Sequence, residues 1–208
     1  MTTETTAAEW VPERPGLARL REAATECRGC ELWEDATQVV FSSGPRSARM
    51  MLVGEQPGDQ EDKAGEPFVG PAGRLLDRAL ADADIAREQV YLTNAVKHFR
   101  HVDRGKRRLH QKPELRHLVA CGPWLEAELD VVRPDVVVAL GATAARAVLG
   151  RPAKIGAERG HVLDEPAGRR SLITNHPSAL LRVRDRDERA SAYDGFVSDL
   201  RAAAAALP

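Results

Sequence analysis

The sequence predicts an α/β fold in which a parallel sheet is covered by helices on both faces. Short apolar runs, typical of buried strands, alternate along the chain with longer amphipathic runs, typical of helices. The expected strands are residues 48–54, 90–96, 135–140 and 171–174, and the expected helices are residues 71–83, 113–132, 141–149 and 188–206. With 208 residues, 43% of them hydrophobic, the chain is long enough to form a globular domain with a sizeable core.

The segments before the first strand follow from local patterns. Residues 1–15 are expected to be a loose tail, followed by a single domain over residues 16–208. Apolar residues recur at helical spacing within residues 16–26, which predicts a helix. Residues 38–41 are expected to be a short strand, and residues 42–46 a turn.

The connections between the main elements are also predictable. Residues 59–69 contain so many charged residues, glycines and prolines that we expect a long functional loop. Pro71 stands near the start of the helix that follows, where its missing N–H costs little. Val162 and Leu163 are expected to form a minor strand or hairpin before the last main strand.

Composition narrows the class of protein. The formal net charge is −1, and the N-terminus shows no basic and apolar succession typical of a secretion signal. The longest uncharged apolar stretch, residues 136–145, is too short to span a bilayer. We therefore expect a cytoplasmic protein without membrane contact, and a monomer.

Charge is concentrated in one segment. Residues 97–112 hold seven Lys or Arg residues against the single acid Asp103, a local charge of +6. Most charge runs are merely solvated surface. A cluster of one sign on a nearly neutral chain is also the electrostatic signature of a phosphate-binding edge, so both interpretations stay open.

Polar residues follow three of the expected strands. Glu55 and Gln56 come after the first strand in a glycine-containing turn, Asn94 lies in the second, and His176 follows the last. Because the carboxyl ends of parallel strands meet at one edge of a sheet, these side chains are expected to converge on one pocket. A carboxylate and an amide, in place of a phosphate-binding glycine series, favour a polar and neutral ring as the ligand.

The three cysteines suggest a metal site. Cys27 and Cys30 form a C-x-x-C pair, and Cys121 lies far along the chain. Three thiolates leave such a site one ligand short. His98 is the natural fourth ligand, with His101 as its competitor. The alternative is a redox C-x-x-C pair with one buried, inert cysteine.

Together these motifs resemble a known family. GEQPG at 54–58, PFVGPAG at 67–73, NAVK at 94–97, CGPW at 121–124 and HPS at 176–178 resemble the iron–sulfur, family-4 uracil-DNA glycosylases. The resemblance extends from Cys27 to the final helix. It implies a three-layer α/β/α fold with a central four-stranded parallel sheet, and a [4Fe–4S] cluster.

Three departures from the family-4 pattern point to a narrower group. Gln56 replaces an alanine, His98 replaces a cysteine, and residues 105–110 form an insert. These features resemble the X-type uracil-DNA glycosylases of bacteria. That resemblance implies a cluster held by Cys27, Cys30, His98 and Cys121. It also implies that His110 becomes covalently attached to the sugar after uracil is lost.

The resemblance and the chemistry of the side chains assign the base pocket. Phe68 is expected to stack on the base, and its loop rich in Gly and Pro favours this role over the alternative of plain core packing. Asn94 is expected to hydrogen-bond the edge of uracil, and His176 to donate to the uracil anion as it forms. Glu55 is expected to orient His110 and to stabilise the cationic sugar.

The remaining contacts are expected with DNA. Single-stranded DNA is the expected preference, because an unpaired base avoids most of the unstacking cost. Ser178 and Arg182 are assigned to phosphate, and Lys106 and Arg107 to phosphate or to anchoring of the loop. Gln56 is expected to hold the insert, through Arg108. Gly54 and Asp59 are also expected to bind uracil or DNA.

Two other functions remain in competition with the covalent glycosylase. One is a conventional uracil-DNA glycosylase that turns over and releases free uracil, with the insert only holding DNA. The other is a non-catalytic, metal-containing module that binds single-stranded nucleic acid through residues 97–112. The module would bind any strand in a salt-dependent way, with or without uracil.

Overall fold

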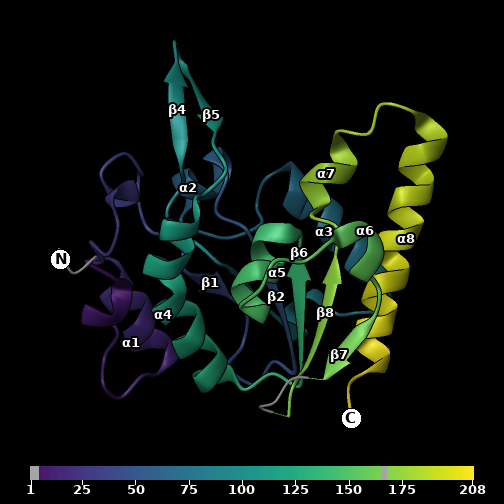
Figure 1. Ribbon diagram of the computed structural model, residues 1–208, viewed down its shortest axis with the longest axis horizontal. Coiled ribbons are helices and arrows are strands. Elements are labelled where there is room, and N and C mark those ends of the chain that lie inside the picture. The colour runs from purple at the N-terminus through teal and green to yellow at the C-terminus, as the bar shows by residue number, and fades with distance from the viewer. Residues whose placement is uncertain (1–4, 165–167) are drawn as a thin grey trace.

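The computed structural model describes residues 5–164 and 168–208. Its central sheet contains the four expected parallel strands, in the spatial order β3-β2-β6-β8 (Figure 1). Their bounds are β2 (Met50–Gly54), β3 (Val90–Asn94), β6 (Val136–Leu140) and β8 (Arg170–Thr174). Two short antiparallel strands extend the edges, β1 (Ser42–Ser43) beside β3 and β7 (Val162–Asp164) beside β8. The predicted four-stranded parallel sheet is confirmed, and so is the minor strand at Val162.

Helices cover both faces of this sheet, which gives the predicted three layers. On one face lie α3 (Pro71–Asp82), α7 (Pro177–Leu181) and α8 (Arg186–Ala205). On the other lie α4 (Leu115–Val132) and α5 (Ala142–Leu149), with α1 (Leu17–Ala24) packed against α4 (Figure 1). Within the described ranges, no helix is both long and apolar enough to cross a membrane.

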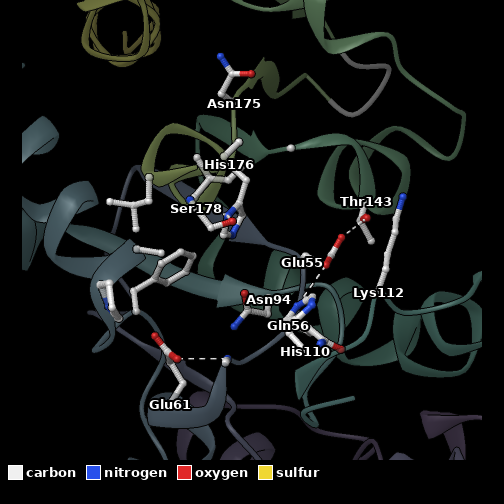
Figure 2. A pocket seen from close by; sticks show the side chains of 18 of the residues that line it. Glu55, Gln56, Glu61, Asn94, His110, Lys112, Thr143, Asn175, His176 and Ser178 are labelled. Atoms are coloured by element: carbon white, nitrogen blue, oxygen red, sulfur yellow. Dashed lines mark hydrogen bonds and ion pairs between the residues drawn. The ribbon is translucent and has the colours of Figure 1, made fainter. Parts of the chain in front are cut away.

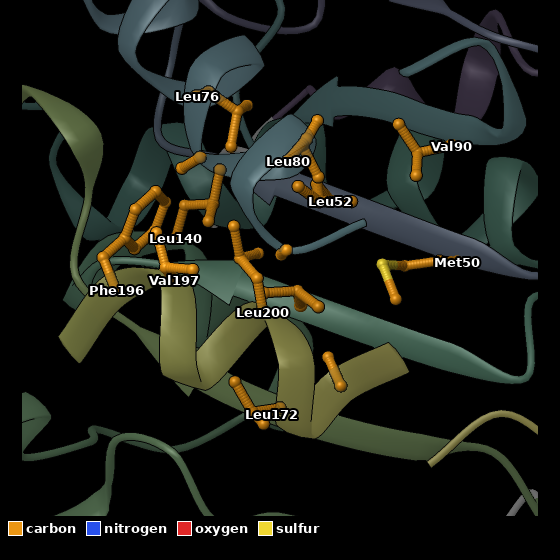
Figure 3. Packing of buried hydrophobic residues seen from close by; sticks show 14 of the residues in the cluster. Met50, Leu52, Leu76, Leu80, Val90, Leu140, Leu172, Phe196, Val197 and Leu200 are labelled. Atoms are coloured by element: carbon orange, nitrogen blue, oxygen red, sulfur yellow. The ribbon is translucent and has the colours of Figure 1, made fainter. Parts of the chain in front are cut away.

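The core follows from the two-residue period of the strands. Side chains alternate between faces, so Leu52 packs toward α3 and α8 while its neighbours Met51 and Val53 pack toward α4 and α5. Figure 3 shows Leu52 among Leu76, Leu80 and Leu200 on the first face. Because both faces are covered, β2, β3 and β6 are buried along their whole length.

The N-terminal segments differ from expectation. Residues 38–41 form no strand, and β1 instead lies at Ser42–Ser43, which was expected to be a turn. Residues 7–9, within the expected loose tail, form the 3-10 helix η1, whose Ala7 is buried against α4. Residues 1–4 of that tail lie outside the described residues. Short elements that were not expected are η2 (Glu31–Trp33), η3 (Arg87–Gln89) and α6 (Ile155–Glu158).

The expected loop at residues 59–69 is wrong in its first half, which forms helix α2 (Asp59–Ala64). A carboxylate oxygen of Glu61 accepts the backbone N–H of Gly58, 3.1 Å away, and so caps the helix start. Acidic residues in the first turn also favour the positive end of the helix dipole. Gly65, with φ +75°, ends the helix in the left-handed conformation.

The basic segment, expected to be a loop, contains a two-stranded antiparallel hairpin. Strand β4 (His101–Arg104) pairs with β5 (Arg107–His110), and residues 105–106 form the turn. Gly105 has φ +61°, which suits a tight hairpin turn. The hairpin projects beyond the main sheet on the side where the parallel strands end (Figure 1).

Candidate active site

A cavity of about 860 Å³ opens at the carboxyl ends of the parallel strands. Figure 2 shows side chains from separate elements pointing into it. Expected site residues that line it are Glu55, Gln56, Asp59, Phe68, Asn94, His110, His176, Ser178 and Arg182. The sheet geometry thus brings together residues that are far apart in sequence.

Gly54, at the end of β2, makes room for the side chains of Asn94 and Phe68. A Cβ atom there would lie 2.2 Å from Asn94 Oδ1 and 2.7 Å from Phe68 Cζ. Both side chains therefore lie directly over the Gly54 backbone. Phe68 has φ +60°, an uncommon conformation for a bulky residue. Its ring is stacked with that of His176 at a centroid distance of 6.4 Å. The backbone conformation of Phe68 and the ring of His176 thus both fix the place of the Phe68 ring.

His176 is held in one tautomer. It caps helix α7, where its Nδ1 accepts the backbone N–H of Ser178 at 3.2 Å and lies 2.8 Å from Ser178 Oγ. Burial lowers the pKa of His176 to about 4, with the positive charge of Arg182 and the nearby His110 acting in the same direction. The ring is therefore neutral at pH 7. Because Nδ1 accepts, the proton is on Nε2, which can donate.

Glu55 and His110 face each other in the same cavity. His110 Nε2 lies 3.5 Å from Glu55 Oε1, and Glu55 Oε2 accepts a hydrogen bond from the Thr143 hydroxyl (Figure 2). Burial lowers the pKa of His110, and the Glu55 carboxylate opposes that shift only in part. The imidazole is thus neutral at pH 7, half-exposed, and next to a carboxylate whose direction is fixed.

Gln56 holds the base of the hairpin, by a route that was not expected. Its Nε2 donates to the carbonyl oxygens of Arg100 and Gln111, both at 3.1 Å, and its Oε1 accepts the N–H of Arg100 at 3.2 Å. The buried amide thereby joins the two chain segments that lead into and out of the hairpin. The expected contact through Arg108 is wrong, because the backbone at the hairpin base already uses the amide.

Arg108 anchors the side of the hairpin to α2. Its Nε lies 2.6 Å from Asp59 Oδ1, and its Nη1 lies 2.6 Å from Asp62 Oδ2 and 3.0 Å from Thr37 Oγ1. Hydrogen bonds from Lys63 and then Arg108 lower the pKa of Asp59. Asp59 lines the cavity, but its carboxylate is committed to these two cations.

The basic segment is less basic at its surface than its composition suggests. Lys97 is fully buried and paired with Glu128, and Arg100 is paired with Glu114. Those two cations and Arg108 are therefore neutralised within the protein. Four of the seven remain exposed: Arg104, Lys106, Arg107 and Lys112. Lys106 and Arg107 lie near the hairpin tip and do not line the cavity, whereas Lys112 does.

The three cysteines are free and belong to one cluster with Trp124. The Trp124 indole N–H donates to Cys27 Sγ, and the Lys97 backbone N–H donates to Cys121 Sγ, both at 3.3 Å. Burial raises the pKa of the Cys121 thiol to about 12. Among residues 5–164 and 168–208, no three His, Cys, Asp or Glu side chains are arranged to hold a metal ion.

The two candidate histidines occupy different places. His98 is buried, and burial lowers its pKa to about 4, so it is neutral and suited to be a ligand. His101 belongs to the hairpin, where it stacks on Phe99 at a centroid distance of 4.9 Å and lies opposite His110. Because His101 lies in the hairpin strand β4, His98 is favoured as the fourth ligand.

Two residues of the site were missed. Thr143 follows strand β6, whose end lies at the same sheet edge as the other strand ends, so the same argument could have found it. Glu61 lines the cavity and accepts backbone N–H groups from Gly58 and Gly70, at 3.1 and 2.8 Å. Its spacing of three residues from Gly58, that of a capping box, is the local signal that could have found Glu61.

Known proteins are similar in sequence to this chain over most of its length. The family described as "Uracil DNA glycosylase superfamily" matches residues 41–201. The type-4 uracil-DNA glycosylase of Thermotoga maritima is 39% identical over 169 residues, which cover 81% of this chain and 84% of the relative. That of Pyrobaculum aerophilum is 34% identical over 173 residues, covering 80% and 85%.

A third relative is matched over a shorter part. The type-4 uracil-DNA glycosylase of Sulfurisphaera tokodaii is 36% identical over 126 residues, which cover 60% of this chain and 54% of the relative. The superfamily match includes all four parallel strands and the whole cavity edge that they form. This chain belongs to the uracil-DNA glycosylase superfamily.

Proposed function

We propose that this chain excises uracil from DNA and that His110 then captures the abasic sugar as a covalent adduct, as its resemblance to X-type uracil-DNA glycosylases implies. One observation carries the proposal: His110, with its pKa lowered by burial, lies 3.5 Å from the Glu55 carboxylate in the family's cavity. A neutral imidazole is a competent nucleophile at pH 7. Its place in the cavity, beside that carboxylate, supports a role in capturing the sugar.

The base is held by Phe68 and Asn94. Stacking on an aromatic ring contributes about 1–3 kcal/mol per base and does not depend on sequence. The Asn94 amide offers a donor and an acceptor to the uracil edge, whereas cytosine reverses part of that pattern and leaves buried groups unpaired. Uracil is thus selected by hydrogen bonding.

Departure of uracil places negative charge on the base and positive charge on the sugar. The tautomer of His176 leaves Nε2–H free to donate to the uracil anion, because Nδ1 is occupied by Ser178. The carboxylate of Glu55, held by Thr143, stabilises the sugar cation from the opposite side.

The capture of the sugar by His110 needs no reactant other than the protein and the DNA, because bonds, charge and protons all balance. The bond between C1′ and uracil N1 breaks, and its electron pair leaves with the base. A lone pair on the imidazole then forms the new bond to C1′. The alkylated imidazolium carries one positive charge, which balances the uracil anion; one proton passes from the ring to uracil by way of solvent. The products are free uracil and a neutral adduct.

Single-stranded DNA is the proposed substrate. An unpaired nucleotide enters the cavity without most of the unstacking cost, which is on the order of a few kcal/mol. The exposed cations of the hairpin and Lys112 supply charge for the backbone beside the cavity. Arg182 and Ser178 line the cavity, and we assign them to the phosphate next to the flipped nucleotide.

A [4Fe–4S] cluster held by Cys27, Cys30, His98 and Cys121 is the proposed cofactor. Two observations support it: the three cysteines pack in one hydrophobic cluster, and two of the thiols accept N–H groups, as cluster sulfurs do. When bound, the cluster supplies cross-links between the N-terminal turn, α4 and the segment that leads into the hairpin. Its role is structural.

The test is a denaturing gel. Wild-type protein is mixed with a labelled single-stranded oligonucleotide that contains one uracil, beside a thymine control. His110→Ala is the test variant, and His101→Ala, on the paired strand of the same hairpin, is its matched control. We expect a uracil-dependent band that resists SDS and heat with wild type and His101→Ala, and no band with His110→Ala.

The second candidate is a conventional enzyme that turns over. The observation in its favour is that the relatives reported above are named type-4 uracil-DNA glycosylases. It predicts alkali-labile product in excess of enzyme and no resistant band. If neither a band nor uracil release occurs, both proposals are wrong, and a nucleic-acid-binding module is the better description.

A further inference from the structure

Beneath the base pocket lies an ion pair that is shielded from solvent. Lys97 Nζ is 2.5 Å from Glu128 Oε2, and the two side chains are 1% and 0% exposed. Placing two charges in the protein interior is costly unless their hydrogen bonds are fully satisfied. The contacts of this pair therefore indicate what it holds in place.

Each donor of the Lys97 ammonium has a partner. Nζ lies 2.5 Å from Thr93 Oγ1, 2.9 Å from the backbone oxygen of Asn94, and 2.5 Å from the Glu128 carboxylate. The ammonium has three protons, so none is left over. Glu128 is held in turn by Thr93 and by Tyr91, whose hydroxyl lies 2.9 Å from Oε1.

The contact with Asn94 connects this pair to the pocket. The Asn94 carbonyl belongs to the residue whose side chain lies over Gly54 and faces the cavity. On the other side of the same peptide group, the Ala95 N–H donates to the Gly54 carbonyl at 2.9 Å. Lys97 thus holds one side of the peptide link after Asn94, and β2 holds the other, which fixes where the Asn94 amide points.

Lys97 is itself held at its backbone. Its N–H donates to Cys121 Sγ at 3.3 Å, and its carbonyl accepts the N–H of Val40 at 2.9 Å. The residue therefore has little freedom to move at either end. Because Lys97 is held this firmly, its ammonium group can fix the position of the groups that it contacts as well as stabilise the fold.

We propose that the buried Lys97–Glu128 pair positions Asn94 and so sets the orientation in which the pocket reads its base. The inference rests on the proposed function, since it assigns Asn94 to the base. Lys97 acts through Asn94 and touches no substrate; it is a positioning residue. Misplacement by about 1 Å of a group that orients a reactant can cost on the order of 10²-fold in rate.

The test variant is Lys97→Met combined with Glu128→Gln. Changing Lys97 alone would leave an unpaired carboxylate in the interior and could unfold the protein. The double variant removes both charges, keeps the volume similar, and removes the donor to Asn94. Tyr91→Phe is the matched control, because it removes one contact to the same carboxylate and leaves the ammonium on Asn94 in place.

Uracil release from a single-stranded oligonucleotide is measured with protein in excess, which gives a saturating rate and a half-saturating protein concentration. Thermal unfolding is recorded for each variant. For the double variant we expect a saturating rate about 10²-fold below that of Tyr91→Phe, with the half-saturating concentration within about threefold, because the DNA contacts remain.

Three results would overturn the inference. One is a saturating rate of the double variant within about threefold of the control. Another is a lower rate matched by an equal loss of folded protein at the assay temperature, which would make the role purely structural. The third is a change in half-saturating concentration alone. Absence of release by the wild type would instead refute the proposed function.

Discussion

Arg108 and Asp62 form an ion pair in which Nη1 lies 2.6 Å from the oxygen of a carboxylate that is 0% exposed. Arg108 belongs to β5, two residues before His110, and Asp62 belongs to α2. The pair therefore ties the strand that carries the proposed nucleophile to the body of the domain. Gln56 holds the same hairpin at its base, so the position of His110 is determined from two directions.

Replacing Arg108 should slow adduct formation without abolishing it. In Arg108→Ala the hairpin keeps its Gln56 contacts but loses the α2 anchor, so His110 samples more positions. We expect adduct formation to fall about tenfold to 10²-fold. Arg107→Ala, exposed on the same strand, is the control and should stay within about threefold of wild type at moderate salt. Equal effects would indicate a shared role in binding phosphate.

Gly54→Ala should disable the base pocket while leaving the fold intact. The new Cβ would overlap Asn94 Oδ1 and Phe68 Cζ, so one of these side chains must move. We expect uracil release to fall about 10²-fold or more. In Gly122→Ala, on helix α4, the new Cβ meets no atom within 4 Å, and it should stabilise the protein by about 0.5–1 kcal/mol with unchanged activity. Undiminished release by Gly54→Ala would contradict the assigned pocket.

Thr143 is expected to orient Glu55. A hydrogen bond to a charged group contributes about 1.5–3 kcal/mol, so Thr143→Val should reduce the single-turnover rate of uracil release by roughly tenfold to 10²-fold. Thr143→Ser keeps the hydroxyl and should retain most of the rate. If Thr143→Val keeps its rate while Thr143→Ser loses it, the methyl group matters and the hydrogen bond does not.

The rate of adduct formation should be insensitive to pH near neutrality. Because burial lowers the pKa of His110 below 6.5, the ring stays neutral as the pH falls from about 8 to 6.5, and the rate should decline only at lower pH. Glu55→Gln removes the charge that opposes this shift, so its decline should begin at still lower pH. Rates taken from denaturing gels across pH test this, and a wild-type decline centred above pH 6.5 would argue against it.

Iron content distinguishes the two candidate histidine ligands. His98→Ala should lower bound iron and the visible absorbance of the protein, whereas His101→Ala, on the hairpin, should leave both unchanged. Iron analysis and absorbance spectra of the purified variants supply the measurement. Retention of colour by His98→Ala would show that His98 is not a ligand.

The sheet could be predicted because its signal is local. Runs such as 136–140 are apolar throughout and short, as expected of a strand buried on both faces. The position of His176 at the sheet edge followed from topology alone. Helix α2 has one local signal, Glu61 three residues after Gly58, but its other favourable term, the burial of Asp62, depends on Arg108, 46 residues away along the chain, which a linear pattern does not reveal.

The basic segment also shows what a sequence pattern alone cannot reveal. Composition counts Lys97 and Arg107 alike, yet one is buried on Glu128 and the other is exposed. The difference arises from a partner 31 residues away along the chain. Sequence similarity identified His110 and Gln56 as special, but the contacts of Gln56 with the backbone of Arg100 and Gln111 required the fold.

In the part of the chain that the structure describes, strands β4 and β5 pair only with each other and add no strand to the main sheet. An appendage of this kind can lengthen, shorten or change its tip residues over evolutionary time while the fold beneath it persists. If the proposed function holds, recognition of the base and the fate of the sugar are encoded in separable parts of one chain. A descendant with a shorter hairpin would then admit water where His110 now lies, and the proposed crosslinking would give way to turnover.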